Sequence, residues 1–496
     1  MAPPTRERVV LVTGATGYVG SHLVMHLLEE DPHVRVRGSV RSAGAAAPLV
    51  ELMRPDARAR FEECVADLMD AEGWEAACSG CETVFHVASP ASPLGSFETV
   101  VEPAVRGTIN VMAAAARSPS VTRVVYTSSV TTLGPLPSAR RLGEADWADL
   151  WGGPPLLWDA YARGKVAAEL CAWLFAAPDG GAPMPREEIL RRLAPPPGGA
   201  PGGAVPGAWL ERMVESIRAA GPCRLEVVAV APSVVLGPVL LRKHCGHMSS
   251  SADFVLEEMV APDHLGQPPF RMPVVGTRAL RHHPHAAPRL RGASNGHSAV
   301  ADRPPRKDFR DVVRCHVRAM DDASLAGRRI LVSSRSVPLV ELARHVRANF
   351  APGFGAALVF RWPRALLPLY ALTRLSCKRA TDVAPRTGLA VWELVHVSML
   401  PRLLADCGRA QRQFDTELAR ALLGGAFIDA EEMVRDTGAS LVRLGAARAE
   451  DAAASLRRVW VVAACACACA ACLVVPWMHR MLWPLGEASL YLILST

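Results

Sequence analysis

VVLVTGATGYVGSHLVMHLLEE, residues 9–30, joins three patterns that follow one another along the chain. The apolar run Val9–Val12 is typical of a buried strand, and the apolar residues of Ser21–Glu30 recur at helical spacing. Three glycines at three-residue intervals separate the two segments. This order predicts a strand, a tight turn and a helix whose N-terminus faces phosphate groups, as in a dinucleotide-binding fold.

The three glycines have separate tasks in such a turn. Gly14 permits the tight bend, Gly17 lets the backbone approach a pyrophosphate, and Gly20 lets the helix pack closely on the strand. A purely structural turn is the alternative interpretation, and the strand and helix patterns on either side argue against it. The cofactor contacts expected here are made by Gly14, Thr16, Gly17, Tyr18, Val19 and Gly20.

The same alternation continues along the first half of the chain. Further strand patterns cover residues 34–40, 63–66, 83–87, 123–126 and 225–230, with a helical pattern at 105–116. Strands separated by helices predict an α/β fold with a Rossmann doubly wound parallel sheet. A chain of 496 residues, of which 50% are hydrophobic, also has room for a smaller C-terminal substrate lobe.

Composition divides the chain into six segments, two of which are expected to be irregular insertions. The predicted segments are a dinucleotide-binding domain (1–177), a Pro/Gly-rich insertion (178–223), a sheet continuation that starts the substrate lobe (224–275), a basic irregular insertion (276–307), the substrate lobe with an amphipathic region (308–456) and a hydrophobic tail (457–496). In the first insertion we expect only a short helix, Trp209–Ala219. A helix at 312–320, a strand at 329–333 and a helix at 337–349 are assigned to the substrate lobe.

Charge and cysteine content narrow the class of protein. The net charge of +7 lies mostly in the basic insertion and beside apolar segments, which argues against nucleic acid as a partner. The 13 cysteines form no evenly spaced framework, so we expect a reducing compartment. The first residues contain no apolar signal region, and secretion is not expected.

The end of the second strand, VRVRGSVR (34–41), indicates which nicotinamide cofactor is bound. An acidic residue there binds the adenosine ribose hydroxyls, whereas a basic residue receives a 2′-phosphate. Val40 stands in the place of the acid, and Arg37 and Arg41 offer guanidinium groups for phosphate contact. The sequence favours NADP(H) over NAD(H); a solvated strand edge is the alternative role of the arginines.

A second motif points to proton transfer. Tyr161 and Lys165 form a YxxxK pair, whose spacing places a phenol and an ammonium group on one helix face. A tyrosine with an ordinary pKa near ~10 needs a neighbouring cation to transfer a proton near neutral pH. Ser128 and Ser129 follow the strand 123–126, at the edge where a parallel sheet binds its ligands.

These motifs resemble the extended short-chain dehydrogenases/reductases of the NAD-dependent epimerase/dehydratase superfamily, particularly the dihydroflavonol 4-reductase and aldehyde/ketone reductase branch. The resemblance is close over residues 9–176 and resumes at 225–238 and 308–320. The motifs that carry it are TGATGYVGSHLV, VRGSVRS, ADL (66–68), GCETVFHVASP (80–90), EPAVRGTINV, VVYTSSV, DAYARGK, APSVVLGP (231–238) and DFRDVVRCHVRAM.

The resemblance implies roles for particular residues. Tyr161 would be the general acid that protonates a carbonyl oxygen, Lys165 would lower the pKa of Tyr161 and bind the nicotinamide ribose, and Ser129 would polarise the carbonyl. It implies further cofactor contacts at Asp67, Leu68, Ala88, Ser89 and Val235. Three departures weaken this transfer of roles: Ala104 replaces an asparagine common in extended members, Gly164 is a poor helix residue, and the insertion follows the catalytic helix.

The implied activity is NADP-dependent reduction of a hydrophobic aldehyde, ketone or dihydroflavonol-like substrate. Residues 361–375 and 414–444 also resemble the C-terminal part of 3β-hydroxysteroid and sterol dehydrogenases, which makes a membrane-associated sterol dehydrogenase the alternative. A non-catalytic dinucleotide sensor, whose insertion fills the substrate site, is a second alternative, and a sugar-nucleotide epimerase is a third. Helices of this fold often pair, so a homodimer is compatible with the sequence.

Two clusters of metal-ligating residue types are interpreted as structural, and no metal is expected. Cys78 and Cys81 form a single CxxC in a turn before a strand, without a second such pair. Residues 282–285, HHPH, lie in an arginine- and proline-rich segment that predicts no fixed geometry.

Residues 459–478, VWVVAACACACAACLVVPWM, contain no charged side chain and are close to the length that spans a hydrocarbon core. Arginines precede the segment, and His479 and Arg480 follow it. We expect a C-terminal transmembrane helix that leaves the catalytic domain in the cytosol, with the endoplasmic reticulum as the candidate membrane. A buried hydrophobic helix is the alternative, with a cytoplasmic protein as its consequence; 482–494 would be a partial second span or an interfacial segment.

Overall fold

A computed structural model describes most of the first half of the chain and parts of the second. The described residues are 7–90, 96–134, 141–152, 159–178, 182–196, 205–219, 224–245, 271–275, 310–350, 414–425 and 427–447. The basic insertion, residues 351–413 and the hydrophobic tail lie outside them, and so do the histidine cluster and the first sterol-dehydrogenase-like segment. No helix among the described residues is long and apolar enough to cross a membrane.

A parallel seven-stranded sheet forms the centre of the molecule, with the strand order β3-β2-β1-β4-β5-β6-β9. Its strands are β1 (Arg8–Val12), β2 (Val34–Val40), β3 (Phe61–Val65), β4 (Thr83–His86), β5 (Arg123–Thr127), β6 (Glu226–Pro232) and β9 (Arg329–Val332). The strand patterns in the sequence correspond to these strands within two residues at each end. The chain reverses direction across the sheet between β1 and β4, and this is where a doubly wound sheet binds a dinucleotide.

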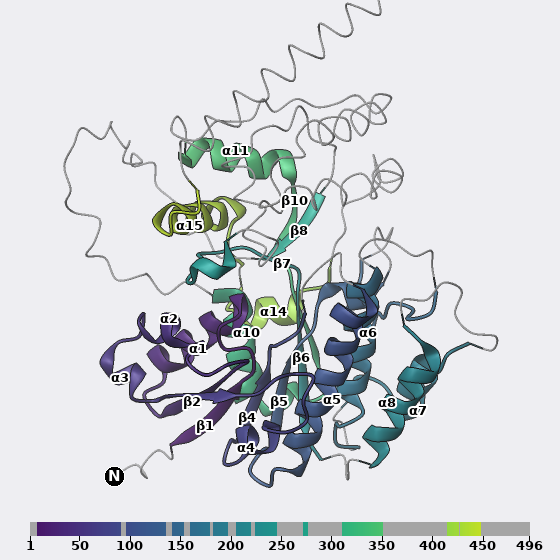
Figure 1. Ribbon diagram of the computed structural model, residues 1–496. Helices are drawn as coiled ribbons and strands as arrows, with labels where there is room; N and C mark the ends of the chain where they lie inside the picture. The colour runs from purple at the N-terminus through teal and green to yellow at the C-terminus, as the bar shows by residue number, and fades with distance from the viewer. Residues whose placement is uncertain are drawn as a thin grey trace, which may run out of the picture.

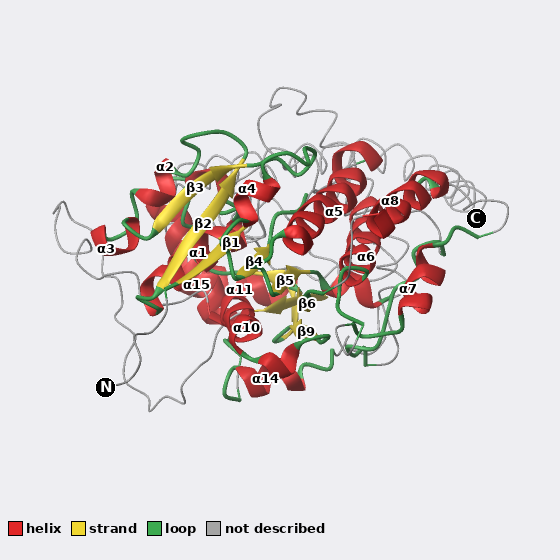
Figure 2. Ribbon diagram, turned by 90° about the horizontal axis from the view of Figure 1, so that it is seen from below, coloured by secondary structure: helices red, strands yellow, loops and turns green. Residues whose placement is uncertain are grey.

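Helices cover both faces of the sheet, as Figure 2 shows from below. On one face α4, α5 and α6 pack over the strands, and on the other α1, α10 and α14 do so. The bounds are α1 (Tyr18–Glu30), α4 (Trp74–Cys78), α5 (Glu102–Arg117), α6 (Asp159–Trp173), α10 (Arg310–Asp321) and α14 (Glu417–Leu422). Shorter elements are α2 (Ala47–Val50), α3 (Pro55–Arg58), a π-helix (Phe97–Val101) and 3₁₀ turns at Val130–Leu133, Arg242–His244 and Ala323–Leu325. The sequence thus forms the three-layer Rossmann architecture.

A second, smaller unit lies above the edge of the sheet where the strands end (Figure 1). It contains β7 (Val234–Val235), β8 (Arg271–Val275), β10 (Arg335–Pro338), α11 (Leu339–Phe350) and α15 (Ala430–Arg443). Its sheet has the order β10-β8-β7, and α11 packs against α15. The lobe is therefore assembled from segments that lie before and after the last strand of the main sheet.

The structure corrects the assignment of residues 312–333 to the substrate lobe. The helix and strand expected there are α10 and β9, but β9 pairs with β6 and α10 packs on α1 and the sheet. Their apolar residues, such as Val313 and Ile330, fill the core under β1, β2 and β6. Both elements belong to the Rossmann domain.

Residues 178–223 hold more regular structure than expected. The expected short helix is observed as α8 (Gly207–Ala219), and the segment also contains α7 (Arg186–Leu193), which was not expected. Ile189 and Leu193 of α7 and Leu210 of α8 are buried, and the two helices pack on α6 and α5, respectively (Figure 1). The described parts of this insertion therefore extend the outer helical layer and do not fill the space above the sheet.

Candidate active site

The glycine-rich turn after β1 has the geometry that its spacing predicts. Gly14 has a φ of 66°, in the left-handed region that favours glycine. A Cβ atom at Gly20 would lie 2.2 Å from the carbonyl oxygen of Gly14, so α1 can approach the turn only without a side chain there. A Cβ at Gly14 would in turn lie 3.1 Å from Ala88, which follows β4. The turn, α1 and the end of β4 thus form a backbone-lined cradle for a dinucleotide.

The N-terminus of α1 meets the loop that follows β7. The Tyr18 hydroxyl donates to the Gly237 carbonyl at 2.9 Å, and His244 donates to the buried Thr16 carbonyl at 2.9 Å. Because the Tyr18 phenol is engaged in this way, the backbone of Tyr18 and Val19 is the part that faces a phosphate. No side chain caps the helix at Gly17, which leaves its first amide groups available to an anion.

Arg37 does not occupy the cofactor edge of the sheet, and its expected phosphate contact is wrong. It lies three residues before the end of β2, and its guanidinium donates to the carbonyls of Ala76, Ala77 and Ser79 at 2.8–3.2 Å. It also pairs with Glu62 at 3.1 Å. Arg37 therefore satisfies the last carbonyls of α4 and is held away from a 2′-phosphate.

Arg41 remains at the expected position, directly after β2, and is exposed. Burial lowers the pKa of Lys243, and repulsion by the positive charge of Arg41 lowers it further. Lys243 lies next to His244 on the same loop, which binds the Tyr18 hydroxyl and the Thr16 carbonyl. Sequence reasoning missed Lys243 because about 200 residues separate it from Arg41 and no local motif marks it.

The expected adenine-side residues follow β3. Asp67 is exposed and its carboxylate accepts a hydrogen bond from the Met69 amide at 2.8 Å. The Leu68 carbonyl accepts from Asn110 of α5 at 2.8 Å. A Cβ at Gly107 would lie 2.7 Å from the Leu68 side chain, so this glycine lets Leu68 pack against α5.

The sequence also shows no sign of a buried hydrogen-bond network under the glycine-rich turn. Thr13 Oγ1 accepts from the amides of Val87 and Ala88 at 3.0 Å and contacts His86 Nδ1 at 3.0 Å, while His86 Nε2 contacts Thr108 Oγ1 at 3.2 Å. Burial, assisted by the charge of Lys165, lowers the pKa of His86 to about 3, so the ring is neutral. This network joins the end of β1 to the end of β4, directly before Ala88 and Ser89.

The structure brings the predicted catalytic side chains together at the end of β5. Ser129 hydrogen-bonds Tyr161, which lies in the first turn of α6. Burial raises the pKa of Tyr161, and the bond with Ser129 opposes this shift. Ser128 instead donates to Glu169, so the second serine is the one beside the phenol.

Lys165 is buried one helical turn after Tyr161, and its ammonium donates to the Thr127 carbonyl at 3.3 Å. Burial lowers its pKa to about 8, and the negative charge of Glu169 opposes that shift. The Thr127 carbonyl and the Glu169 carboxylate thus stabilise the buried ammonium group of Lys165.

Ala104 and Gly164, two of the departures from the family pattern, have a common physical reason. A Cβ at Gly164 would lie 3.2 Å from the Cα of Val101 and 3.7 Å from the Cβ of Ala104. α5 and α6 therefore approach closely at the catalytic turn, and small residues on both helices allow it.

The remaining candidates are structural or peripheral. Val235 lies in β7, whose partner strand is β8 of the small lobe. Cys78 and Cys81 are buried free thiols whose pKa burial raises to about 12 and about 11, respectively. Among the described residues, no group of three or more histidine, cysteine, aspartate or glutamate side chains could hold a metal ion.

A parallel sheet with a glycine turn on one side of the switch point and a Ser–Tyr–Lys set on the other is the arrangement of the Rossmann class of folds. Residues 10–182 match the NAD dependent epimerase/dehydratase family. This part of the chain is therefore similar to that family, the extended short-chain dehydrogenases/reductases.

Curated relatives resemble the same part of the chain. Aldehyde reductase 2 from Sporidiobolus salmonicolor is 40% identical over 181 residues, which cover 34% of this chain and 52% of that protein. Dihydroflavonol 4-reductase from Arabidopsis thaliana is 34% identical over 187 residues, which cover 36% of this chain and 47% of that protein. The chain thus spans about half the length of the curated relatives that it matches.

Solved structures match over a longer part of the chain. The yeast methylglyoxal/isovaleraldehyde reductase Gre2, complexed with NADPH, superposes with a TM-score of 0.55 at 19% identity. Vestitone reductase from alfalfa (Medicago sativa L.) does so with a TM-score of 0.51 at 19% identity. Each comparison covers 88% of this chain and 99% of the other, and at this identity both show a shared fold.

Proposed function

We propose that this protein is an NADP(H)-dependent oxidoreductase that reduces a hydrophobic aldehyde, ketone or dihydroflavonol-like substrate. The observation that carries the proposal is the hydrogen bond between Ser129 and Tyr161 at the end of β5, with buried Lys165 one turn further along α6. The reductase names of the curated relatives support the substrate class.

The cradle of Gly14, Gly17 and Gly20 fits a dinucleotide. A side chain at Gly20 would collide with the Gly14 carbonyl, so its absence lets α1 lie close to the turn. Arg41, with Lys243 beside it, offers positive charge where an adenosine 2′-phosphate would lie. No acidic residue follows β2 to bind ribose hydroxyls in its place. The NADPH complex of the structurally similar Gre2 also supports NADP(H).

The residues at the end of β5 would transfer the proton. The reduced nicotinamide, when bound, supplies the hydride that reaches the carbonyl carbon. The Tyr161 hydroxyl then gives its proton to the carbonyl oxygen, which Ser129 holds by a hydrogen bond. The Lys165 ammonium stabilises the phenolate that Tyr161 becomes, and its charge also favours binding of ribose hydroxyls.

Turnover by the full chain tests this function. NADPH and NADH binding should be followed by a panel of aromatic aldehydes, dihydroflavonols and 3-ketosteroids, with Tyr161→Phe beside the wild type. We expect tighter binding of NADPH, and a loss of kcat of about 10²–10⁴-fold in the variant. Tyr126→Phe is the matched control, because Tyr126 is buried in β5 with its hydroxyl bonded to Thr108.

Other outcomes would select other functions. Steroid oxidation with NADH would favour the sterol dehydrogenase, and dinucleotide binding without turnover would favour a sensor. Full turnover by Tyr161→Phe would overturn the proposed mechanism.

We also propose that residues 457–496 anchor the enzyme in a membrane, with the catalytic domain in the cytosol. The support is the uncharged run 459–478 with basic residues on both sides. Alkaline carbonate extraction should leave the full chain in the membrane pellet and release a variant that ends before Arg457. Release of both proteins would show that the tail does not insert.

A further inference from the structure

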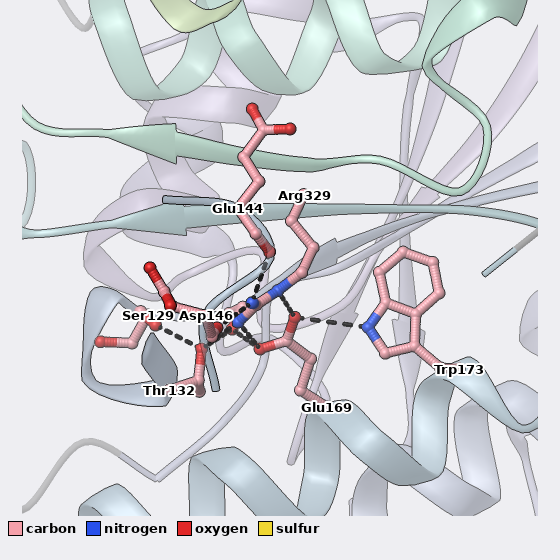
Figure 3. A network of polar contacts seen from close by, with 8 residues as sticks. Ser129, Thr132, Glu144, Asp146, Glu169, Trp173 and Arg329 are labelled. Carbon is pink, nitrogen blue, oxygen red and sulfur yellow. Dashed lines mark hydrogen bonds and ion pairs between the residues drawn. The ribbon is translucent and has the colours of Figure 1, made fainter. Parts of the chain in front are cut away.

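A fully buried ion pair joins the catalytic helix to the last strand of the sheet. Glu169 of α6 and Arg329, the first residue of β9, are both 0% exposed, with Nε and Oε1 2.7 Å apart (Figure 3). Trp173 Nε1 also donates to Glu169, at 3.3 Å. The pair is not part of the Ser–Tyr–Lys set, and none of the motifs in the sequence includes it.

Arg329 uses its whole guanidinium group inside the protein. It donates to the carbonyls of Glu144 and Asp146 at 2.9 and 2.6 Å and to Thr132 Oγ1 at 2.7 Å, and it stacks on the Trp147 ring at 3.8 Å. Figure 3 shows the hydrogen bonds to Glu144, Asp146 and Thr132 converging on this arginine. Arg329 thus ties β9 to the loop 144–147 and to the 3₁₀ turn that follows the two serines.

Two routes lead from this pair to the catalytic serine. Glu169 accepts a hydrogen bond from Ser128, the residue before Ser129. Thr132, the partner of Arg329, donates through its hydroxyl to the Ser129 carbonyl at 2.9 Å. The backbone on both sides of Ser129 is therefore held by the same ion pair.

The pair also reaches the other two catalytic side chains, because Glu169 lies on α6 one turn after Lys165 and two turns after Tyr161. The charge of Glu169 acts on Lys165, where it opposes the effect of burial on the pKa of the ammonium group. Glu169 thus links the turn of Ser128 and Ser129 after β5 to α6, the helix that carries Tyr161 and Lys165.

We propose that Glu169 and Arg329 are positioning residues, which set the register between the Ser128–Ser129 turn and α6 and so maintain the hydrogen bond between Ser129 and Tyr161. The inference rests on the proposed function for its kinetic consequence. It adds two residues that touch neither substrate nor cofactor but determine the geometry of the reacting side chains.

The chain offers a matched control for a purely structural role. Arg123, the first residue of β5, is also buried, pairs with Glu226 and donates to the carbonyls of Ala319, Met320 and Asp322. It lies at the opposite end of the strand that leads to the serines. Arg123→Met therefore removes a comparable arginine without contact to the catalytic turn.

The kinetic test compares Glu169→Gln, Arg329→Met and the double variant with Arg123→Met, each as the full chain and per folded molecule. We expect kcat to fall about 10- to 100-fold in the three pair variants, with the KM for NADPH changed less than about twofold. The double variant should lose no more than either single variant, because the two residues act as a unit. It also removes both charges of the pair, so neither partner is left behind as an unpaired charge, and the test stays valid if a single variant folds poorly.

Rescue separates geometry from charge. Arg329→Lys keeps the positive charge but not the planar fork that reaches Glu169 and Thr132 together, so we expect only partial recovery of kcat. A kcat in the pair variants equal to that of Arg123→Met would show that the pair contributes stability alone and would overturn the inference.

A second readout needs no substrate. The chain has five tyrosines, and in fluorotyrosine-labelled protein the ¹⁹F signal of residue 161 can be assigned from Tyr161→Phe. Because the bond with Ser129 lowers the pKa of Tyr161, the pair variants should move this signal and raise its pH midpoint, whereas Arg123→Met should not. An unmoved signal would overturn the positioning role, and a moved signal without turnover in the wild type would count against the reductase function only.

Discussion

The two flanks of the central sheet prepare the site in different ways. On the side of β3, β2 and β1, the contacts depend on missing side chains: Gly14 and Gly20 let the turn and α1 approach each other, and Gly107 makes room for Leu68. On the side of β5, β6 and β9, they depend on buried charge, with Lys165, Glu169 and Arg329 all 5% exposed or less.

This difference teaches what each flank can do. A glycine turn with a helix N-terminus binds an anion through backbone amide groups, so the turn itself needs no ionisable side chain. A buried lysine and ion pair hold charge in a low-dielectric interior, where they act strongly on a proton that is being transferred. Changes on the cradle flank should therefore alter binding, and changes on the charged flank should alter turnover.

Lys165→Met gives the largest effect and separates turnover from stability. Burial lowers the pKa of Lys165 to about 8, which shows that the charged form is disfavoured in the folded protein. We expect kcat to fall about 10²–10⁴-fold while the thermal midpoint stays equal or rises, because an apolar side chain replaces a buried charge. Steady-state kinetics and a melting curve check both parts; a lowered midpoint with normal kcat would reverse the assignment of the two flanks.

Gly20→Ala should act on the cradle flank. Its Cβ would lie 2.2 Å from the Gly14 carbonyl oxygen, so α1 must move away from the turn. We expect at least about tenfold weaker NADPH binding and a loss of about 1–3 kcal/mol in the free energy of unfolding. Gly143→Ala is the control, since its Cβ would make an ordinary 3.7 Å contact with Asp415; fluorescence titration and urea unfolding measure both variants.

The cradle flank was also the part that the sequence predicted best, and the physical reason is locality. The strand, turn and helix from Arg8 to Glu30 are neighbours in the chain, so glycine spacing and apolar periodicity describe their contacts directly. The YxxxK pair and the serines were predicted for the same reason, since each lies within one element or at its end. The roles of Tyr161, Lys165 and Ser129 in catalysis stay predictions until turnover is measured.

The charged flank shows where that reasoning ends. Glu169 and Arg329 are 160 positions apart, and neither lies in a pattern that indicates a partner. β9 was misassigned to the small lobe because its apolar residues do not reveal which sheet they join. On the cradle flank, Arg37 was misassigned because it and Arg41 lie close together in the sequence, although only Arg41 stands beyond the end of β2.

Arg41 and Arg37 can be separated by a pair of alanine variants. Arg41→Ala should weaken NADPH binding about 10-fold or more with little change for NADH, because it removes a charge placed for the 2′-phosphate. Arg37→Ala should leave both affinities within about twofold and lower stability, because the carbonyls at the end of α4 lose their donor. The reverse result, with NADPH discrimination lost only in Arg37→Ala, would restore the original assignment of Arg37.

The smallest effect concerns the pH dependence of stability, and its sign follows from Lys165. Its pKa is about 8 in the folded protein against an ordinary value of 10.5, so between these values the unfolded chain binds more protons than the folded one. Stability contributed by this group therefore rises as pH increases from 8 to 10.5. Buried tyrosines and thiols with raised pKa values act in the opposite direction, so the wild type must be compared with Lys165→Met by urea unfolding at each pH. Between pH 8 and 10.5 the free energy of unfolding of the wild type should rise relative to that of Lys165→Met. A constant difference would show that Lys165 is not held in a desolvated site. The contrast between the flanks would then lose its electrostatic basis.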